Sequence, residues 1–450
     1  MVKIFICSYK LCVAMYMGLY GLDRRQWSQI LAAWGGWLMD GYTSIAYALV
    51  GLTIAPIFFP ASLHLIGIVA TFAGFAVGAL ARSIGSLALG NFLGDKVGRK
   101  SMLVITVLFF SVFSAAKAVL PSYSEVGIIS PILLYIALFL EGFFGGAEYG
   151  GGTTLSMESV PAEKRNFIGS FVQSGYGTGY FIVAFVYAGL RAYFGSAFSV
   201  VGWRVLFATA LVPGVITVVL RAISWETPVF EEMKTRGEVE RVPIKGLLRQ
   251  APKTMFFAVL ITTGLLFVNT ATFSFYPSIM TTKGFSGVDI GEGVAIINLI
   301  SLFGVWIGGA FGNTINGRKK PMLIYALIFL LSVYPILRVG YYGDYTVFVT
   351  AFSVQAFLEA MIFSTLPAFL SEQFSKKFRA TGVGFTYNAG AIVGGFAISI
   401  IFALSSTIGL FTSWLTLMIV FSLIMAIGIA LSEETWMRTR DTKAEDRIKE

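Results

Sequence analysis

Ionisable side chains stand inside several long apolar stretches of this sequence. Asp40, Arg82, Glu141, Glu148 and Glu359 are each flanked by mainly apolar or small residues. A charge in such a place is costly, so each group must be protonated, paired with an opposite charge or exposed to water. A buried carboxyl that exchanges a proton is suited to proton coupling. A buried arginine can bind a carboxylate through two parallel hydrogen bonds.

Asp40 is the first candidate for proton coupling. It lies about 12 residues into an expected helix, or roughly 18 Å along its axis. Thr43, Ser44 and Tyr47 share its helical face and form a polar stripe, so Thr43 and Tyr47 are candidates for binding a substrate. The alternative is that Asp40 is a structural, hydrogen-bonded acid.

Arg82 is the candidate for binding a substrate carboxylate. Pairing of Arg82 with Asp40 or Glu148 as a structural bond is the alternative. Three glycines on its helical face indicate close contact with a neighbouring helix, namely Gly74, Gly78 and Gly85.

Glu141 and Glu148 lie two helical turns apart with Gly145 between them. Two acids on one buried stripe suit proton handling or cation binding, although one of them could instead neutralise Arg82. Glu359 occupies the position of Glu141 in a second copy of the tripeptide FLE, so it is a further protonatable candidate or a partner for a base.

The elements that must position these residues are membrane-spanning helices. Of the 450 residues, 56% are apolar and 13% are charged, and the mean hydropathy is +0.78. The apolar runs are continuous rather than alternating, which predicts an all-α polytopic membrane protein without strands. We expect twelve spans, at 29–57, 63–90, 101–120, 127–152, 165–192, 200–222, 254–280, 287–312, 321–340, 345–370, 380–404 and 408–431.

Basic residues mark every second loop between these spans. They cluster at Arg24–Arg25, Lys96–Lys100, Lys164–Arg165, Lys234–Lys253, Arg318–Lys320 and Lys376–Arg379. This positive-inside pattern predicts a multi-pass protein of the cell membrane with both termini cytoplasmic, and it explains the net charge of +9 without nucleic acid. The expected domains are an N-terminal extension (1–28), a six-helix bundle (29–222), a cytoplasmic linker (223–253), a second bundle (254–431) and a tail (432–450).

The two halves repeat one another. Glycines precede Arg99–Lys100 in the first half and Arg318–Lys319 in the second. Glu158 precedes Arg165 by seven residues, and Glu372 precedes Arg379 by seven. Two pseudo-symmetric six-helix bundles are the architecture of rocker-type transporters, whose substrate site lies near the midplane between the halves.

The stretch GNFLGDKVGRK at 90–100 resembles the loop signature of the major facilitator superfamily between its second and third helices. The resemblance implies a conformational latch in which Asp95 and Arg99 bind charged partners and Gly90 and Gly98 permit close helix approach. A solvated basic loop that only fixes topology is the alternative. The remaining latch candidates, at expected inner helix ends, are Glu158, Arg165, Arg318, Glu372 and Arg379.

Further motifs resemble the metabolite:proton symporter family. They are ARSIG (81–85), GFFGGAEYGGG (142–152), ESVPAEKRNFIGSFVQSGYGTG (158–179), GWRVLF (202–207), ETPVFEE (226–232) and GFTYNAGAIVGGFA (384–397). The resemblance implies uptake of organic acids or zwitterions with protons, and it adds cavity candidates on helices that line the family's cavity. These are Asn269, Tyr276, Tyr387 and Asn388. Thr43 stands where the family has a second acid and Leu138 where it has an arginine, which leaves uncoupled facilitation open.

The sequence therefore predicts a secondary transporter that moves a small organic solute, with an organic acid anion as the leading substrate and protons as the coupling ion. A sugar or polyol porter and a non-transporting nutrient sensor are the alternatives. The chain has no P-loop, HExxH or CxxC motif, so we expect neither an enzyme nor a bound metal or cofactor. We expect a monomer embedded in the lipid bilayer.

Overall fold

The computed structural model describes residues 19–60, 62, 64–89, 99–225, 235, 247, 249, 251–315, 317–375 and 379–436, with backbone alone at 19 and 99–101. The described residues form helices and no strand. Twelve helical segments are long and apolar enough to span a membrane, as the apolar runs predict. The chain is thus an all-α, multi-pass membrane protein.

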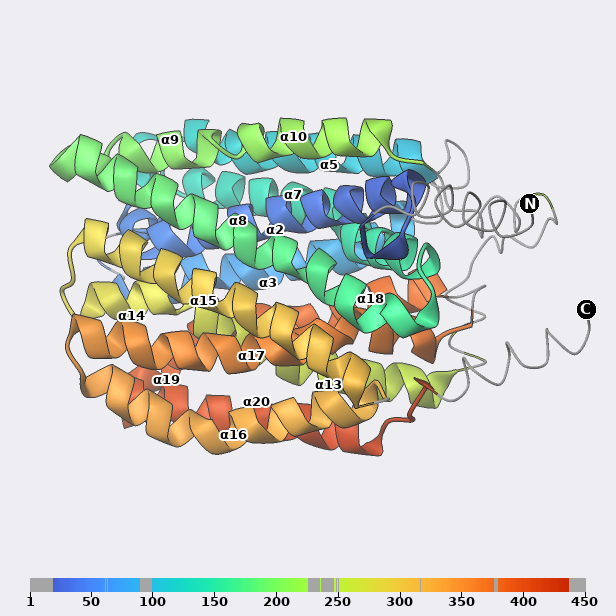
Figure 1. Ribbon diagram of the computed structural model, residues 1–450. Helices are drawn as coiled ribbons and strands as arrows, with labels where there is room; N and C mark the ends of the chain where they lie inside the picture. The colour runs from blue at the N-terminus through green and yellow to red at the C-terminus, as the bar shows by residue number, and fades with distance from the viewer. Residues whose placement is uncertain are drawn as a thin grey trace, which may run out of the picture.

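The first half supplies six spans, which lie side by side in the upper part of Figure 1. They are α2 (Arg24–Phe58), α3 (His64–Ala88), α5 (Arg99–Ala116) with the short η4 (Lys117–Val119), α7 (Ile129–Glu158), α8 (Arg165–Phe194), and α9 (Gly202–Ala208) continued by α10 (Leu211–Ile223).

The second half supplies the other six, mostly in the lower part of Figure 1. They are α13 (Pro252–Asn269) with η7 (Thr270–Ser274) and α14 (Tyr276–Thr282), then α15 (Gly287–Thr314), α16 (Lys319–Tyr342), α17 (Tyr345–Gln373), α18 (Arg379–Gly395) with α19 (Ala397–Ile408), and α20 (Leu410–Leu431).

The first span begins earlier than the sequence pattern suggests. Helix α2 starts at Arg24 because the Asp23 side chain accepts a hydrogen bond from the Gln26 backbone N–H, while the Gln26 side chain accepts from Asp23 N–H. This reciprocal cap satisfies two of the otherwise unpaired donors of the helix start. The pair Arg24–Arg25, which reads as an inner loop, therefore belongs to the first turn of the helix.

The seventh span is interrupted in its middle. The π-helical turn η7 separates α13 from α14, and Pro277 stands in the first turn of α14. Proline lacks the N–H that a continuous helix would need and its ring crowds the preceding turn. The interruption begins directly after Asn269, whose side chain is buried in the protein interior.

Two sets of helices make the most extensive contacts between the halves. Helix α8 packs against α15 and α17, and α18 packs against α3 and α7. The second contact is close where Gly150 of α7 meets Gly384 of α18, since a Cβ atom on Gly150 would lie 2.9 Å from the Gly384 Cα. Small residues at such crossings let membrane helices approach closely.

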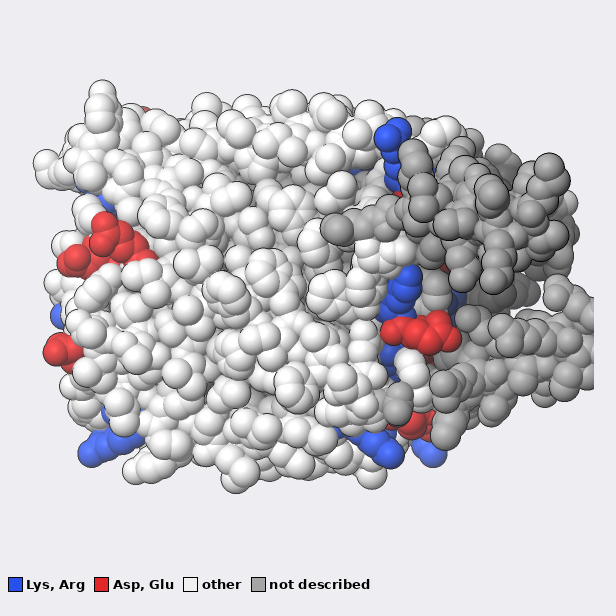
Figure 2. All heavy atoms as spheres, viewed as in Figure 1, with Lys and Arg blue, Asp and Glu red and all other residues white. Residues whose placement is uncertain are grey.

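Charged side chains lie at the two ends of the bundle in the view of Figure 2, with an uncharged band between them. Large apolar side chains point outward from this band, including Leu331 (79% exposed) and Val212 (63% exposed). Such a surface matches lipid rather than water. We name the end where α2 begins and α20 ends the latch end.

Candidate functional site

A central cavity lies between the two halves and spans about 780 Å³, a volume that includes open space at its mouth. Its described lining comes from both halves, chiefly α2, α3, α7 and α18. Eight of the residues singled out in the sequence line it: Asp40, Thr43, Tyr47, Arg82, Glu141, Asn269, Tyr387 and Asn388.

Asp40 and Arg82 form an ion pair at this cavity. The Arg82 Nη1 atom donates to Asp40 Oδ2 at 2.9 Å, and Nη2 donates to Oδ1. The Asp40 side chain is 5% exposed and that of Arg82 is 19% exposed. Of the arrangements open from the sequence, the structure therefore has Arg82 paired with Asp40 and not with Glu148. The bidentate geometry is the one that a substrate carboxylate would also use.

A second ion pair joins Lys117 and Glu141 on the wall of the same cavity. The Lys117 Nζ atom donates to Glu141 Oε2 at 2.7 Å, and the Ser114 hydroxyl donates to Oε1 at 2.5 Å. The ammonium also lies 4.9 Å from the ring centre of Phe207. Sequence reasoning missed Lys117 because a base at the end of an apolar stretch usually marks the membrane surface. The available signal was its position inside the expected span 101–120, three residues before the end.

Glu148 lies outside the described lining of the cavity. It accepts a hydrogen bond from Arg221 Nη2 at 2.5 Å, and both side chains are buried. Gly36 of α2 covers this pair, because a Cβ atom there would meet both charged groups. Arg221, another base near a helix end, was not anticipated as its partner.

The polar side chains of α2 and α18 in the cavity wall already have partners. The Tyr47 hydroxyl donates to the Thr71 carbonyl at 2.6 Å, and Thr43 donates to the Asp40 carbonyl at 3.2 Å. Asn388 donates to the carbonyl of Gly146, in the other half, at 3.2 Å.

Aromatic rings close the cavity toward the latch end. Tyr387 of α18 stacks on Tyr149 of α7, and Trp37 of α2 meets Tyr387 edge-on with ring centres 5.8 Å apart. These contacts join the two halves. Any opening of the cavity toward that end must separate Tyr387 from Tyr149.

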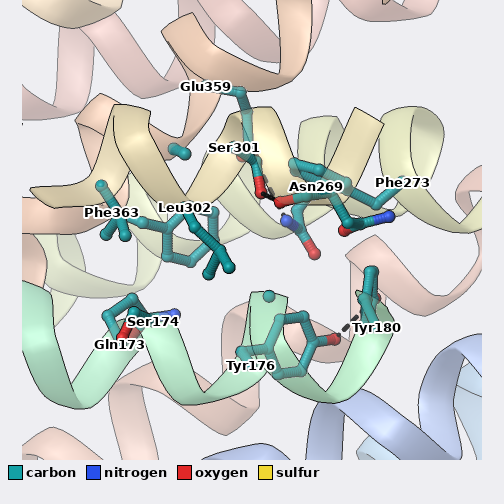
Figure 3. Close-up of a pocket in the computed structure, with 14 residues that line it drawn as sticks. Gln173, Ser174, Tyr176, Tyr180, Asn269, Phe273, Ser301, Leu302, Glu359 and Phe363 are labelled. Atoms are coloured by element: carbon teal, nitrogen blue, oxygen red, sulfur yellow. Dashed lines mark hydrogen bonds between the residues drawn. The ribbon is translucent and has the colours of Figure 1, made fainter. Parts of the chain in front are cut away.

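Glu359 lines a separate pocket of about 360 Å³, shown in Figure 3, which we name the Glu359 pocket. Its Oε1 atom accepts a hydrogen bond from Asn269 Nδ2 at 3.0 Å. Asn269 and Tyr176 line both this pocket and the central cavity. Tyr276 lines neither described space, and its hydroxyl donates to Gln355 at 2.9 Å.

Four latch candidates meet across the two halves at the latch end. Arg165 Nη1 donates to Glu372 at 3.1 Å, and Arg379 Nη1 donates to Glu158 at 3.3 Å. Each arginine also donates its Nε to a carbonyl of its own half, Met157 for Arg165 and Ser371 for Arg379. The two contacts thus repeat the same geometry in opposite directions. Gly90, Asp95, Gly98 and the Arg99 side chain lie outside the described residues.

Arg318 connects this latch to the residues after α20. Its guanidinium donates to both carboxylate oxygens of Glu372 at 2.9 Å and lies 4.4 Å from the Trp436 ring centre. The Thr435 hydroxyl donates to the same carboxylate at 3.2 Å. Glu372 therefore joins both halves and the chain segment that follows the last span.

Known proteins match this chain over most of its length. It is 29% identical over 377 residues to an inner membrane metabolite transport protein, YhjE, of Escherichia coli (strain K12), covering 81% of this chain and 84% of that one. It is 28% identical over 399 residues to the shikimate transporter of the same organism, with 84% and 87% covered. The proline/betaine transporter of that strain is 28% identical over 390 residues, with 83% and 76% covered.

The fold matches solved transporters. The proton:xylose symporter XylE bound to 6-bromo-6-deoxy-D-glucose superposes with a TM-score of 0.73 at 18% identity, covering 91% of this chain and 96% of that chain. The family model described as Major Facilitator Superfamily matches residues 42–398. These proteins are transporters rather than enzymes. The chain therefore belongs to the Major Facilitator Superfamily and is a secondary transporter of that type.

Proposed function

We propose that the protein carries a small organic acid anion together with protons by alternating access. The observation that supports this most directly is the Asp40–Arg82 pair on the wall of the central cavity. The relatives named for metabolite, shikimate and proline/betaine transport support a small organic solute as the substrate.

Charge balance links the proton to the anion. Arg82 and Lys117 are the cationic side chains in the described cavity lining, and each is bound to a carboxylate. A substrate carboxylate that competed with charged Asp40 for Arg82 would leave two anions beside one cation. Protonation of Asp40 removes its charge and frees the guanidinium, so the anion and the proton bind together.

Alternating access would then use the contacts between the halves. The described ion pairs Arg165–Glu372 and Arg379–Glu158 and the Tyr149–Tyr387 stack keep the halves together at the latch end. Opening that end breaks these contacts while each half remains intact. Binding and release on opposite sides follow from exchange between the two arrangements.

The basic loops support an orientation with the latch end and both termini in the cytoplasm, in the cell membrane. We also propose that the protein is a monomer. Its two six-helix bundles would span residues 29–222 and 254–431, with a cytoplasmic linker at 223–253.

Uptake into proteoliposomes tests the function. We would impose an inward proton gradient and offer monocarboxylates, dicarboxylates, aromatic acids, betaine and sugars, with and without a protonophore. Accumulation of an acid that the protonophore abolishes is expected. Sugar flux that ignores the gradient would overturn the proposal in favour of a sugar porter or uncoupled facilitator, and binding without flux would indicate a sensor.

Asp40→Asn tests the coupling residue. The variant keeps a polar side chain of the same size but cannot exchange a proton, so it should lose accumulation driven by the proton gradient and retain counterflow exchange. Glu292→Gln, an exposed carboxyl of α15, is the matched control and should behave as the wild type. Unchanged gradient-driven accumulation by Asp40→Asn would remove Asp40 from the mechanism.

A further inference from the structure

We infer that the Glu359 pocket is a binding subsite for a cationic group, supplied either by a substituted ammonium group of the transported solute or by a free monovalent cation. The inference rests on the proposed transport function, because the pocket adjoins the central cavity through the shared residues Tyr176 and Asn269. It extends that function by assigning a ligand to a space that the Asp40–Arg82 mechanism does not use.

The first argument is the charge of the pocket. Glu359 is 1% exposed, and none of the fourteen described residues that line its pocket is a lysine, arginine or histidine. In the part of the chain that the structure describes, its recorded side-chain partner is the neutral Asn269. A buried carboxylate without a cation is unfavourable, so a cationic ligand would stabilise it.

The internal repeat shows that the two halves differ in whether this glutamate has a cationic partner. Glu141 and Glu359 end the two copies of FLE, and Glu141 is neutralised by Lys117. In the segment that contains Lys117, the two halves are displaced by 218 to 219 positions, as Arg99 to Arg318 and Glu141 to Glu359 show. This places Pro335 and Ile336 opposite Lys117. The second half therefore keeps the acid and lacks the base at the corresponding position.

The second argument is a surplus of hydrogen-bond acceptors. Asn298 is fully buried and its Nδ2 donates to the Val294 carbonyl, which leaves its Oδ1 without a donor among the described residues. The Oε1 atom of Gln173, a residue only 6% exposed, has none there either. A buried acceptor without a donor costs about 1–3 kcal/mol. A pocket lined by a carboxyl and by two residues with unpaired amide oxygens suits a cation or an N–H donor.

The third argument is the aromatic lining. Tyr176, Tyr180, Phe273 and Phe363 border the pocket, and the labelled rings of Figure 3 lie on both sides of it. The rings of Tyr180 and Phe273 meet edge-on with centres 5.9 Å apart. Aromatic faces attract substituted ammonium groups. The aromatic lining therefore favours the organic ammonium as the occupant.

Thermal unfolding of the purified full-length protein in detergent tests the subsite without requiring transport. The probes are tetramethylammonium chloride, sodium chloride, glycine betaine and 3,3-dimethylbutyrate, which has the shape of betaine with carbon in place of the charged nitrogen. The variant Glu359→Gln keeps the size and the hydrogen bond to Asn269 and removes the charge. Gln173→Glu adds a carboxyl to the same pocket at equal volume and removes no hydrogen bond described for Gln173.

Tetramethylammonium and betaine should raise the unfolding temperature of the wild type, with apparent affinity at least about tenfold weaker in Glu359→Gln. They should bind Gln173→Glu more tightly, and 3,3-dimethylbutyrate should not distinguish the three proteins. A dependence on Glu359 seen with sodium chloride alone would identify a free ion as the occupant.

The inference is overturned if neither ammonium compounds nor sodium produce a shift that depends on Glu359. If Glu359→Gln does not purify, Gln173→Glu decides the matter, since unchanged cation affinity there would contradict the subsite. Failure of the proposed transport function appears separately, as absent uptake in proteoliposomes with the binding shift retained.

Discussion

Arg165 at the start of α8 donates a hydrogen bond to Glu372 near the end of α17 at 3.1 Å, so an arginine of the first half is neutralised by a carboxylate of the second. Glu372 also binds Arg318 of its own half. One buried carboxylate is thus shared by two guanidinium groups. Its loss would remove this counter-charge from both arginines.

The latch is the subject of the first prediction. Glu372→Gln should favour the arrangement open at the latch end and lower stability by about 3–5 kcal/mol, the range for removing one partner of a buried charge pair. The measurement is thiol labelling from the latch end in a protein with Cys7 and Cys12 replaced by serine and Ala391, which lines the cavity, replaced by cysteine. Lys320→Gln, an exposed change at the same end, is the control. Equal labelling of both variants would show that Glu372 does not hold this end closed.

Substitution of Arg82 by lysine tests two-point binding of the substrate. Lysine keeps the positive charge but cannot make the paired hydrogen bonds that Arg82 makes with Asp40. Loss of one charged hydrogen bond is worth about 1.5–3 kcal/mol, so affinity for the transported acid should fall by about 10- to 100-fold. Binding titrations with purified protein measure the change, and full affinity in Arg82→Lys would exclude bidentate binding of the acid.

Lys117 and Glu141 should depend on each other for stability. Lys117→Met leaves the Glu141 carboxylate buried without its cation and should destabilise the protein by about 3–5 kcal/mol. The double variant Lys117→Met with Glu141→Gln removes both charges and should recover much of that loss. Denaturant unfolding of the single and double variants measures the coupling, and additive losses would show that the pair is not a unit.

A larger side chain at the crossing of α7 and α18 should shift the equilibrium toward the arrangement that is open at the latch end. A Cβ atom on Gly150 would lie 2.7 Å from the Ala380 carbonyl oxygen, so Gly150→Val should separate the halves and expose the cavity at the latch end. The control is Gly189→Ala in α8, where an added Cβ meets nothing within 4 Å. The same thiol-labelling assay reports the outcome, and a wild-type pattern for Gly150→Val would show that the crossing is not part of the closure.

The helices could be predicted from the sequence because continuous apolar runs leave little choice of structure in a membrane. The expected span at 345–370, for example, is Tyr345–Gln373 in the structure. The start of α2 was missed because the basic pair there resembles a loop, whereas the cap that begins the helix depends on the side chains of Asp23 and Gln26.

The candidate site was less accessible to sequence reasoning. The acids stood out inside apolar runs, but their partners depend on which helices are neighbours. Asp40 pairs with Arg82 across α2 and α3, whereas Glu141 and Glu148 use Lys117 and Arg221, two bases near helix ends. The Glu359 pocket combines four separate helices, and no local pattern brings its acceptors together.

The exchanged bonds at the latch end also bear on the ancestry of the fold. Each half carries one glutamate and, seven residues later, one arginine, and each gives its arginine to the glutamate of the other. Two-fold symmetry makes every such contact occur twice. An ancestral six-helix unit with one copy of this motif would therefore have formed both bonds as a homodimer. The same two bonds would have formed when two copies of the unit were first joined in one chain.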